Sequence, residues 1–519
     1  MADQDGNSIR SSAQASLTIL PSYQLNPINR LIYSGFIEHM GRCVYGGIFD
    51  PANNNKSLLT ESSSLRKDVI EAYKPLDVPV FRYPGGNFTA TYHWQDGVGP
   101  MNKRPARLNL AWGGQIEDNA FGTDEFLVWC RDHMNAEPYL CLNMGTGTLD
   151  EALAWLEYCN ATGNSYYAKL RREHVGHDRP HKVKYWGLGN EVWGPWQIAQ
   201  TETPHEYAEK AMQWAKALKL LDPSIKLILC GKEGISSWDF EVIKHAVQPA
   251  TQSDLGVTQP PLIDYVSIHM YTSNTDYCSN VFAPLSAERS IEATSALIDI
   301  AATENRVPPS QPKPLICFDE WNVWDAKRAI GSKGAEERYT LADALAVAVW
   351  LNVFIRQSDK VGMACIAQSV NVISPLMTTH DGIIKQTSWY VYELFCKYMR
   401  GHQIQYALDC ATYKGNLKRN WQHNYLPTKT KWLDISACVD DDEYCCVAVA
   451  NLHKEDDIST SITGVKSGTI VEVYVVTGES VEVDNMDGEE KVTIKDTRWT
   501  ADEIFTFSKH SFTLLRWKI

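Results

Sequence analysis

Two glutamates, Glu191 and Glu320, are the residues of this sequence best placed to do chemistry. Each follows a short apolar run that reads as a β-strand, residues 182–188 for the first and 314–318 for the second. A glutamate alone at a strand end is typical of a solvated or salt-bridged residue. Two carboxyl groups that face each other, each near an asparagine and an aromatic residue, are what glycoside hydrolysis requires. The pair therefore predicts a hydrolytic site.

The residues next to each glutamate do not decide which is the acid and which is the nucleophile or base. Asn190 precedes Glu191, and its amide can hydrogen-bond a sugar hydroxyl. Asp319 precedes Glu320, and the alternation of side chains along a strand predicts that Asp319 points to the opposite side. The two roles stay open at this point.

Other predicted strand ends carry further polar side chains. Asn87 follows a pair of glycines after one strand, His269 and Tyr271 share a face at a spacing of two, and Gln368 ends another strand. A lone histidine here is more typical of a packed, hydrogen-bonded residue than of a metal ligand. Because no second His or Cys stands at ligand spacing, the sequence predicts no catalytic metal and no cofactor. The glycine pair is not part of a phosphate-binding motif.

Repeated β-α units must position these side chains. The predicted strands are residues 46–49, 78–83, 138–143, 182–188, 225–229, 265–269, 314–318 and 361–368. Amphipathic, helix-like segments follow or separate them at 123–134, 205–221, 287–303, 337–356 and 387–400. Eight units with buried strands favour a (β/α)8 TIM barrel, whose active site lies at the carboxyl ends of the strands.

The last part of the chain follows a different pattern. Apolar and polar residues alternate with period two in segments 445–450, 469–476, 491–494, 505–507 and 512–517, with Gly, Asn and Asp between them. This predicts a C-terminal antiparallel, jelly-roll-like β-sandwich, to which the β-rich residues 16–20 add an N-terminal strand. We therefore expect a catalytic barrel over 30–390 and a sandwich built from 1–29 and 391–519.

Composition limits the class of partner. The 519 residues are 44% apolar and 22% charged, and 63 acidic against 49 basic side chains give a net charge of −14. An acidic chain is a poor partner for nucleic acid or an anionic membrane surface. The longest clean apolar run, residues 344–351, is much shorter than a membrane-spanning helix needs.

Two further features bear on the compartment. No hydrophobic signal segment begins the sequence, which predicts a cytoplasmic or non-classically released protein unless this chain is a mature, secreted form. The 13 cysteines are odd in number and lack zinc-type spacing. Many lie in apolar segments, so we expect buried free thiols in a reducing compartment.

Tryptophan is unusually frequent for this residue type, with 17 among the 519 residues. Flat aromatic rings suit the C–H faces of sugars, although tryptophan is also ordinary core material. Several fall in or beside the motifs above and are candidates for a sugar pocket and its approaches. They are Trp94, Trp112, Trp193, Trp196, Trp321 and Trp324.

These motifs together resemble glycoside hydrolase family 51, the retaining α-L-arabinofuranosidases. The blocks that carry the resemblance run in family order across nearly the whole chain. They are FIEH at 36–39, YGGI at 45–48, RYPGGNF at 82–88, LGNE at 188–191, GPWQ at 194–197, HMY at 269–271, DEWNVW at 319–324, VNV at 370–372 and HSFT at 510–513. One Asn-Glu pair is a weak signal, but the ensemble is specific.

The resemblance assigns the roles that the residues alone left open. It implies that Glu191 is the general acid/base and Glu320 the nucleophile. It also implies an exo-acting enzyme that removes terminal α-L-arabinofuranosyl groups from arabinan, arabinoxylan and their oligosaccharides, and a homo-oligomer. The substrate-binding residues that it implies are Glu38, Asn87, Asn190 and Gln368 at the furanose hydroxyls, Tyr271 and His269 beside the nucleophile, and Trp112 and Trp324 as pocket walls.

The chain departs from the family pattern at two places. Trp193 stands two residues after Glu191, where many members carry an acidic residue, and a glycine pair follows Trp112 where bulkier residues are common. Both changes bear on the preference for the leaving group rather than on the reaction. Since the family also contains endo-acting enzymes, an endo-β-glycanase acting on glucan or xylan is the alternative.

Overall fold

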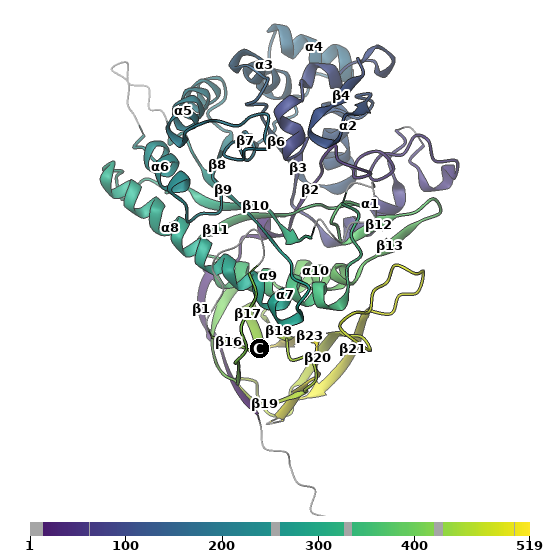
Figure 1. Ribbon diagram of the computed structural model, residues 1–519, viewed down its shortest axis with the longest axis vertical. Coiled ribbons are helices and arrows are strands. Elements are labelled where there is room, and N and C mark those ends of the chain that lie inside the picture. The colour runs from purple at the N-terminus through teal and green to yellow at the C-terminus, as the bar shows by residue number, and fades with distance from the viewer. Residues whose placement is uncertain (1–13, 62, 251–259, 326–334, 420–428, 503) are drawn as a thin grey trace, which may run out of the picture.

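The computed structural model describes residues 14–61, 63–250, 260–325, 335–419, 429–502 and 504–519. The chain forms a barrel of alternating strands and helices and, below it in Figure 1, a large sheet. The predicted fold class, a (β/α)8 barrel with a C-terminal sheet domain that takes in an N-terminal strand, is confirmed.

Eight parallel strands close the barrel. In order around it they are β10 (Leu315–Val323), β11 (Val361–Ile366), β2 (Ser34–Phe36), β3 (Val80–Tyr83), β6 (Glu137–Cys141), β7 (Tyr185–Leu188), β8 (Lys226–Cys230) and β9 (Tyr265–Thr272). Nearly all of their residues are buried, because helices cover the outside and side chains fill the inside. Strands β7 and β10 therefore bring the two candidate glutamates to one end of the barrel.

The predicted first strand is wrong. Residues 46–49 lie in a series of turns, and the barrel instead takes β2. Local hydrogen bonds explain the difference, since the amides of Ile48 and Phe49 donate to the carbonyls of Cys43 and Val44 at 3.2 and 3.0 Å. Gly46 has a φ of +79°, which suits a glycine in a turn and not a strand.

Helices alternate with the barrel strands. They are α1 (Lys67–Tyr73), α2 (Thr123–Val128), α3 (Leu149–Asn160), α4 (Tyr166–Val175), α5 (Pro204–Leu221), α6 (Ser237–Ala246), α7 (Tyr277–Phe282), α8 (Ser286–Glu304), α9 (Leu341–Arg356) and α10 (Thr387–Tyr398). Helix α5 shows how the sequence sets a boundary. Thr203 and Glu206 form a capping box around Pro204 at the first helical position.

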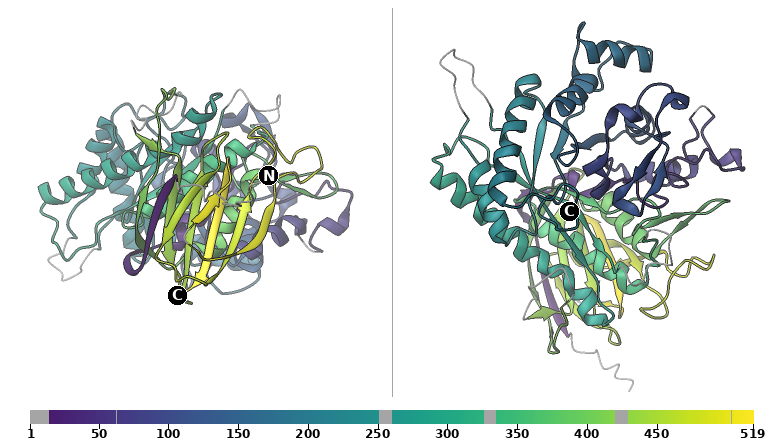
Figure 2. Two further views of the ribbon diagram at one scale, coloured as in Figure 1. Left: turned by 90° about the horizontal axis from the view of Figure 1, so that it is seen from below. Right: turned by 45° about the horizontal axis from the view of Figure 1, so that its top comes forward.

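The second sheet has nine strands in one hydrogen-bonded order. They are β21 (Ile494–Thr500), β20 (Ile470–Val476), β23 (Ser511–Lys518), β18 (Tyr444–Asn451), β17 (Leu433–Val439), β14 (His402–Asp409), β1 (Ala15–Pro27), β19 (Ile458–Thr463) and β22 (Ile504–Phe507). Strand β1 pairs antiparallel with β14 and parallel with β19, while the other neighbours are antiparallel. Seen from below in Figure 2, the purple β1 lies among green strands from the other end of the chain.

Helices α9 and α10 lie between the barrel and the sheet (Figure 1). Helix α9 contacts β10 on one side and β17, β18 and β23 on the other, so it is buried almost all round. A helix with neighbours on every side needs apolar residues on every face, as its sequence LADALAVAVWLNVFIR supplies. The two parts of the molecule are thus joined by a continuous apolar layer.

All 13 cysteines lie in the described residues and are free, and all except Cys278 are buried. This agrees with the expected buried thiols. Within the described part of the chain, no helix is both long and apolar enough to cross a bilayer.

Candidate active site

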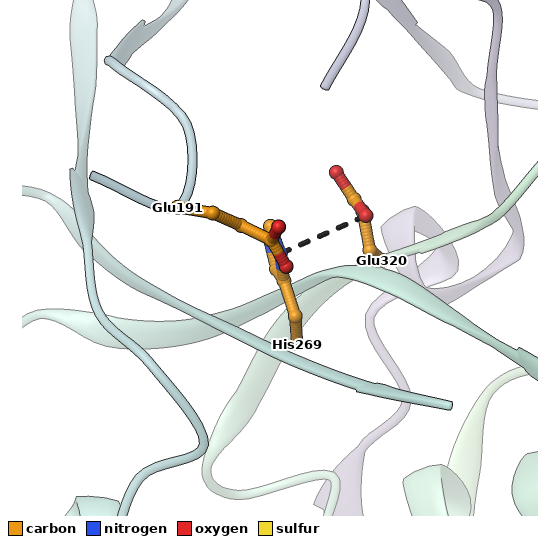
Figure 3. Close-up of side chains that lie close together, drawn as sticks. All are labelled: Glu191, His269 and Glu320. Carbon is orange, nitrogen blue, oxygen red and sulfur yellow. Dashed lines mark hydrogen bonds and ion pairs between the residues drawn. The ribbon is translucent and has the colours of Figure 1, made fainter. Parts of the chain in front are cut away.

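The side chains of Glu191 and Glu320 approach each other at the carboxyl end of the barrel. Figure 3 shows the two side chains pointing toward each other from opposite sides of the site, with His269 below them. Glu191 stands in the loop just after β7, and Glu320 lies within β10. One oxygen of each carboxyl group and one nitrogen of His269 all lie within 4.8 Å of one another.

The backbone at Glu191 has an unusual conformation. Its φ is +42°, a left-handed value that costs a residue other than glycine of order 1–3 kcal/mol. Hydrogen bonds in the following turns hold it, since the amide of Gly194 donates to the Glu191 carbonyl at 2.8 Å and Thr201 donates to Val192 at 2.8 Å. The side chain is thereby aimed across the barrel rather than along the strand direction.

A buried arginine, Arg82 in β3, organises the floor of the site. Its guanidinium donates to Oε1 of Glu320 at 2.7 Å and to Oδ1 of Asn190 at 2.6 Å, and its Nε lies 3.3 Å from Oδ2 of Asp319. The ring of Phe36 lies beneath it, 4.6 Å from the guanidinium carbon. A charge with so little exposure is stable only when paired, and two carboxylates supply the pairing.

Asp319 contradicts the expectation that it points away from the site. It is buried inside the barrel beside Arg82, accepts from Tyr139 at 2.8 Å and lies 3.2 Å from Nε2 of His269. The cause is a β-bulge. Between Cys317 and Glu320, strand β10 has one more residue than the segment of β9 with which it pairs, and this extra residue breaks the alternation of side chains. Burial alone would raise the pKa of Asp319, but Arg82 and His269 hold that pKa well below its usual range.

His269 in β9 links the two catalytic candidates to Asp319. Its Nδ1 lies 3.0 Å from Oε1 of Glu191 and 3.7 Å from Oε2 of Glu320. Burial opposes the charged ring, yet Glu320 and Asp319 outweigh it and raise the pKa of His269 to about 10. The imidazolium thus donates from Nδ1 to Glu191 and from Nε2 to Asp319.

Tyr271, on the same face of β9 as expected, donates to Oε2 of Glu320 at 2.7 Å. Together with Arg82 it occupies both oxygens of that carboxylate and fixes its plane. The ring of Trp324 packs against Tyr271 with centroids 5.3 Å apart and planes at 71°. Trp324 is partly exposed, so it remains a candidate for the wall of the substrate pocket.

Glu38 forms a second centre at the same end of the barrel. Its Oε1 accepts from the amide of Phe88 at 3.0 Å and from Nε1 of Trp112 at 3.1 Å, and its Oε2 accepts from Gln368 at 3.0 Å. Burial is the main cause that raises the pKa of Glu38 to about 7, and the nearby negative charge of Glu320 adds to it. Three predicted substrate-binding residues, Glu38, Trp112 and Gln368, therefore lie in one hydrogen-bonded group.

The amides of Asn87, Asn190 and Gln197 form a third group on the Glu191 side. Gln197 donates to Asn87 and also to Oε2 of Glu191, the latter at 3.1 Å, and Asn190 lies 3.5 Å from Asn87. The structure thus brings all ten predicted site residues to the same end of the barrel. Their contacts with substrate stay predictions.

The glycine pair before Asn87 is explained by the two carboxyl groups. A Cβ atom on Gly85 would lie 2.6 Å from Cγ of Glu38, and one on Gly86 would lie 2.8 Å from Oε1 of Glu320. Neither side chain has room to retreat, because each is held by the hydrogen bonds described above. The backbone after β3 therefore has to be glycine at both positions.

The tryptophans divide into two sets. Trp94 is buried against Trp155, and Trp321 is buried against Trp350 and Phe354, so these two candidates belong to the core and not to a sugar pocket. Trp112, Trp193, Trp196 and Trp324 all keep some exposed surface.

Sequence reasoning missed Arg82, Asp319 and Gln197 as members of the site. A signal for Arg82 was present, because an arginine inside an otherwise apolar strand needs a buried carboxylate as partner. Gln197 lies in the GPWQ block, but nothing in the sequence indicates that its side chain contacts Glu191, as the structure shows.

Glu191, His269 and Glu320 are close enough to hold a metal ion. Both nitrogens of His269 are already hydrogen-bonded to carboxylates, and its raised pKa favours the protonated ring, which is no metal ligand. These residues fit proton transfer better than metal binding. The absence of a catalytic metal stays a prediction.

Comparisons with known proteins give the family. Residues 72–288 match the α-L-arabinofuranosidase 1 domain, and residues 319–511 match the α-L-arabinofuranosidase C-terminal domain. The α-L-arabinofuranosidase C of Emericella nidulans is 58% identical over 502 residues, which is 97% of each chain. An intracellular exo-α-(1→5)-L-arabinofuranosidase of Acetivibrio thermocellus is 33% identical over 92% of this chain and 93% of its own.

Among solved structures, the α-L-arabinofuranosidase of Thermotoga maritima, in complex with arabinose, superposes with a TM-score of 0.85 at 36% identity. The match covers 97% of this chain and 100% of that one. Full-length similarity, the matched domains and the paired glutamates at the end of the barrel agree. The chain belongs to the α-L-arabinofuranosidases of glycoside hydrolase family 51.

Proposed function

We propose that this arabinofuranosidase acts from chain ends and with retention of configuration. The observation that carries the proposal is the spacing of the two carboxyl groups, with oxygens of Glu191 and Glu320 within 4.8 Å. Retaining enzymes hold their carboxyls about 5–5.5 Å apart, whereas inverting enzymes leave about 6.5–9.5 Å for a water molecule. Direct attack by a carboxylate fits the shorter spacing.

In the first step Glu320 is the nucleophile. Arg82 and Tyr271 each bind one oxygen of its carboxylate and orient it. An oxygen of Glu320 forms a bond to the anomeric carbon as the bond from that carbon to the leaving oxygen breaks. Glu191 gives its proton to the leaving oxygen, and a covalent arabinosyl-enzyme results.

In the second step water hydrolyses the arabinosyl-enzyme, with Glu191 as the base. The Glu191 carboxylate takes a proton from water, and the resulting hydroxide oxygen bonds to the anomeric carbon as the ester bond to Glu320 breaks. Two inversions give net retention. His269 and Gln197, which contact the two oxygens of Glu191, hold it in place for both proton transfers.

The furanose ring would lie between the two polar groups described above. We assign its hydroxyl contacts to Glu38, Asn87, Asn190 and Gln368, and its walls to Trp112 and Trp324. The support is that these side chains lie at the same end of the barrel as Glu191 and Glu320, in the two hydrogen-bonded groups around Glu38 and Asn87. Because the pKa of Glu38 is about 7, its carboxyl group would donate a hydrogen bond to a sugar hydroxyl when protonated and accept one when ionised.

Terminal α-L-arabinofuranosyl groups of arabinan, arabinoxylan and their oligosaccharides are the proposed substrates. The exo-α-(1→5) activity of the Acetivibrio thermocellus relative supports chain-end action and arabinan as a substrate. The same relative is described as intracellular, which supports a cytoplasmic location for this chain. Assembly into a homo-oligomer stays a proposal from the family.

Transfer to methanol tests the stereochemistry. With 4-nitrophenyl α-L-arabinofuranoside and added methanol, ¹H NMR should detect methyl α-L-arabinofuranoside as the transfer product. Arabinose of β configuration as the first product, without any transfer, would contradict retention.

Product analysis tests chain-end action. Arabinan and arabinoxylan should release arabinose alone, while the viscosity of a β-glucan stays constant. Oligosaccharides from a β-glucan or xylan with no release of arabinose would support the endo-β-glycanase instead.

A further inference from the structure

Trp196 presents an exposed aromatic ring in the loop that follows Glu191. The residue is 57% exposed, although the loop that carries it is closely hydrogen-bonded. Its neighbour Gln197 donates to Oε2 of Glu191 at 3.1 Å, and Gly194 donates to the Glu191 carbonyl. A large apolar ring held in water on the loop that carries Glu191 is not required by the core.

The ring of Trp196 is fixed by its neighbours. It packs against Trp193 with centroids 5.3 Å apart and planes at 87°. On another side it lies directly on Gly194, where a Cβ atom would come within 2.9 Å of its Cε2 and Cζ2 atoms. Trp196 therefore has little freedom to lose when a ligand binds to it.

Trp193 is in turn fixed to the end of β8. Its Nε1 donates to the carbonyl of Gly231 at 3.0 Å, and the ammonium group of Lys232 lies 5.2 Å from its ring. The carbonyl of Lys232 accepts from the amide of His269 at 2.9 Å, and His269 binds Glu191. The same backbone segment therefore supports both the tryptophan pair and the acid/base.

We propose that Trp193 is a specificity-determining residue that positions Trp196 as a platform for the sugar ring of the leaving group. This ring is the glycan residue that carries the arabinofuranosyl group. The inference rests on the proposed function, in which Glu191 protonates the leaving oxygen, so the leaving sugar must lie on the Glu191 side. Stacking on an indole covers the C–H face of that sugar and leaves its hydroxyl groups in water.

Two substrates separate this contact from the chemistry. α-1,5-Arabinobiose carries a sugar ring on the leaving side, and methyl α-L-arabinofuranoside carries only a methyl group there. Replacing Trp196 by alanine should lower the ratio of kcat/KM for the disaccharide to that for the methyl glycoside about tenfold, from one lost aromatic contact. Tyr166→Ala, which removes a 71% exposed ring on α4, is the matched control and should keep the ratio.

The positioning role of Trp193 has its own test. Trp193→Ala should lower the ratio nearly as far as Trp196→Ala, and Trp193→Phe, which keeps an aromatic ring against Trp196, should restore most of it. The double variant should fall no further than Trp196→Ala, because Trp193 acts through Trp196. Additive losses would contradict that dependence.

The outcomes distinguish the proposals. An unchanged ratio in an active Trp196→Ala enzyme would overturn the platform and leave the proposed function intact. A parent enzyme that cleaved neither substrate would overturn both. Circular dichroism and unfolding curves for each variant confirm that a lower ratio reflects a folded enzyme.

Discussion

Arg82 binds Glu320 inside the barrel, with Nη1 of the guanidinium 2.7 Å from Oε1 of the carboxylate and both side chains at least nine-tenths buried. The same guanidinium also neutralises Asp319. Glu320, the proposed nucleophile, is therefore held in one orientation before substrate arrives, and its charge is balanced by the fold.

Loss of this arginine should destabilise the protein. Arg82→Met removes the arginine that two buried carboxylates share, and we expect the free energy of unfolding to fall by about 3–5 kcal/mol. Urea unfolding measures the change. Arg30→Met is the control, because Arg30 pairs with Asp77 while half exposed and should cost less than about 1 kcal/mol. Equal losses in the two variants would refute a special role for burial.

Removal of the nucleophile should be rescued from outside. Glu320→Gly should be inactive on 4-nitrophenyl α-L-arabinofuranoside, and azide should restore turnover by occupying the vacated space. Attack from that side gives a β-configured arabinofuranosyl azide. An α-configured azide, detected by NMR, would mean that the roles of Glu320 and Glu191 are reversed.

Removal of the acid/base should depend on the leaving group. Glu191→Ala should keep part of its activity on the 4-nitrophenyl substrate, because nitrophenolate leaves without a proton. Arabinobiose needs the proton, so its kcat/KM should fall about 10²–10⁴-fold. Glu202→Ala, at an exposed glutamate in the same loop region, is the control. Equal losses on both substrates would exclude this assignment.

Stability should depend on the protonation of Glu38. Its pKa of about 7 in the folded protein exceeds the usual value, so the folded state keeps a proton that the unfolded state releases above pH about 4.5. The free energy of unfolding should therefore fall as pH rises from about 4.5 to 7, by about 3 kcal/mol for this group. In Glu38→Gln, this contribution to the pH dependence of the free energy of unfolding should be absent.

Paired unfolding curves of the parent and Glu38→Gln at several pH values isolate this group, since the other titrating residues are common to both. Glu173→Gln, at an exposed position, is the control. Parallel pH profiles for parent and Glu38→Gln would show that the carboxyl group ionises normally.

The two glutamates could be predicted from sequence because the barrel imposes their location. Apolar runs end just before Glu191 and within two residues of Glu320, and parallel strands bring such ends together. His269 and Tyr271 were predictable in the same way, since residues two apart on a strand share a face.

Asp319 and the first strand could not be predicted because tertiary structure overrides the local pattern there. A bulge in β10 adds one residue and turns Asp319 inward, against the alternation that the sequence suggests. The β-rich residues 46–49 form turns, whereas the glycine-containing Ser34–Phe36 forms the strand. Gly35 is required there because a Cβ atom would lie 2.5 Å from the ring of Phe81.

The pairing of β1 with β19 has a consequence for synthesis on the ribosome. Thr18 and Thr463, hydrogen-bonded across these strands, are 445 residues apart in the chain. At about 5–20 residues per second, β1 waits roughly 20–90 s after its own synthesis for this partner. Until then the edge of β1 that β19 covers stays unpaired, which makes this edge a site of premature association in the nascent chain.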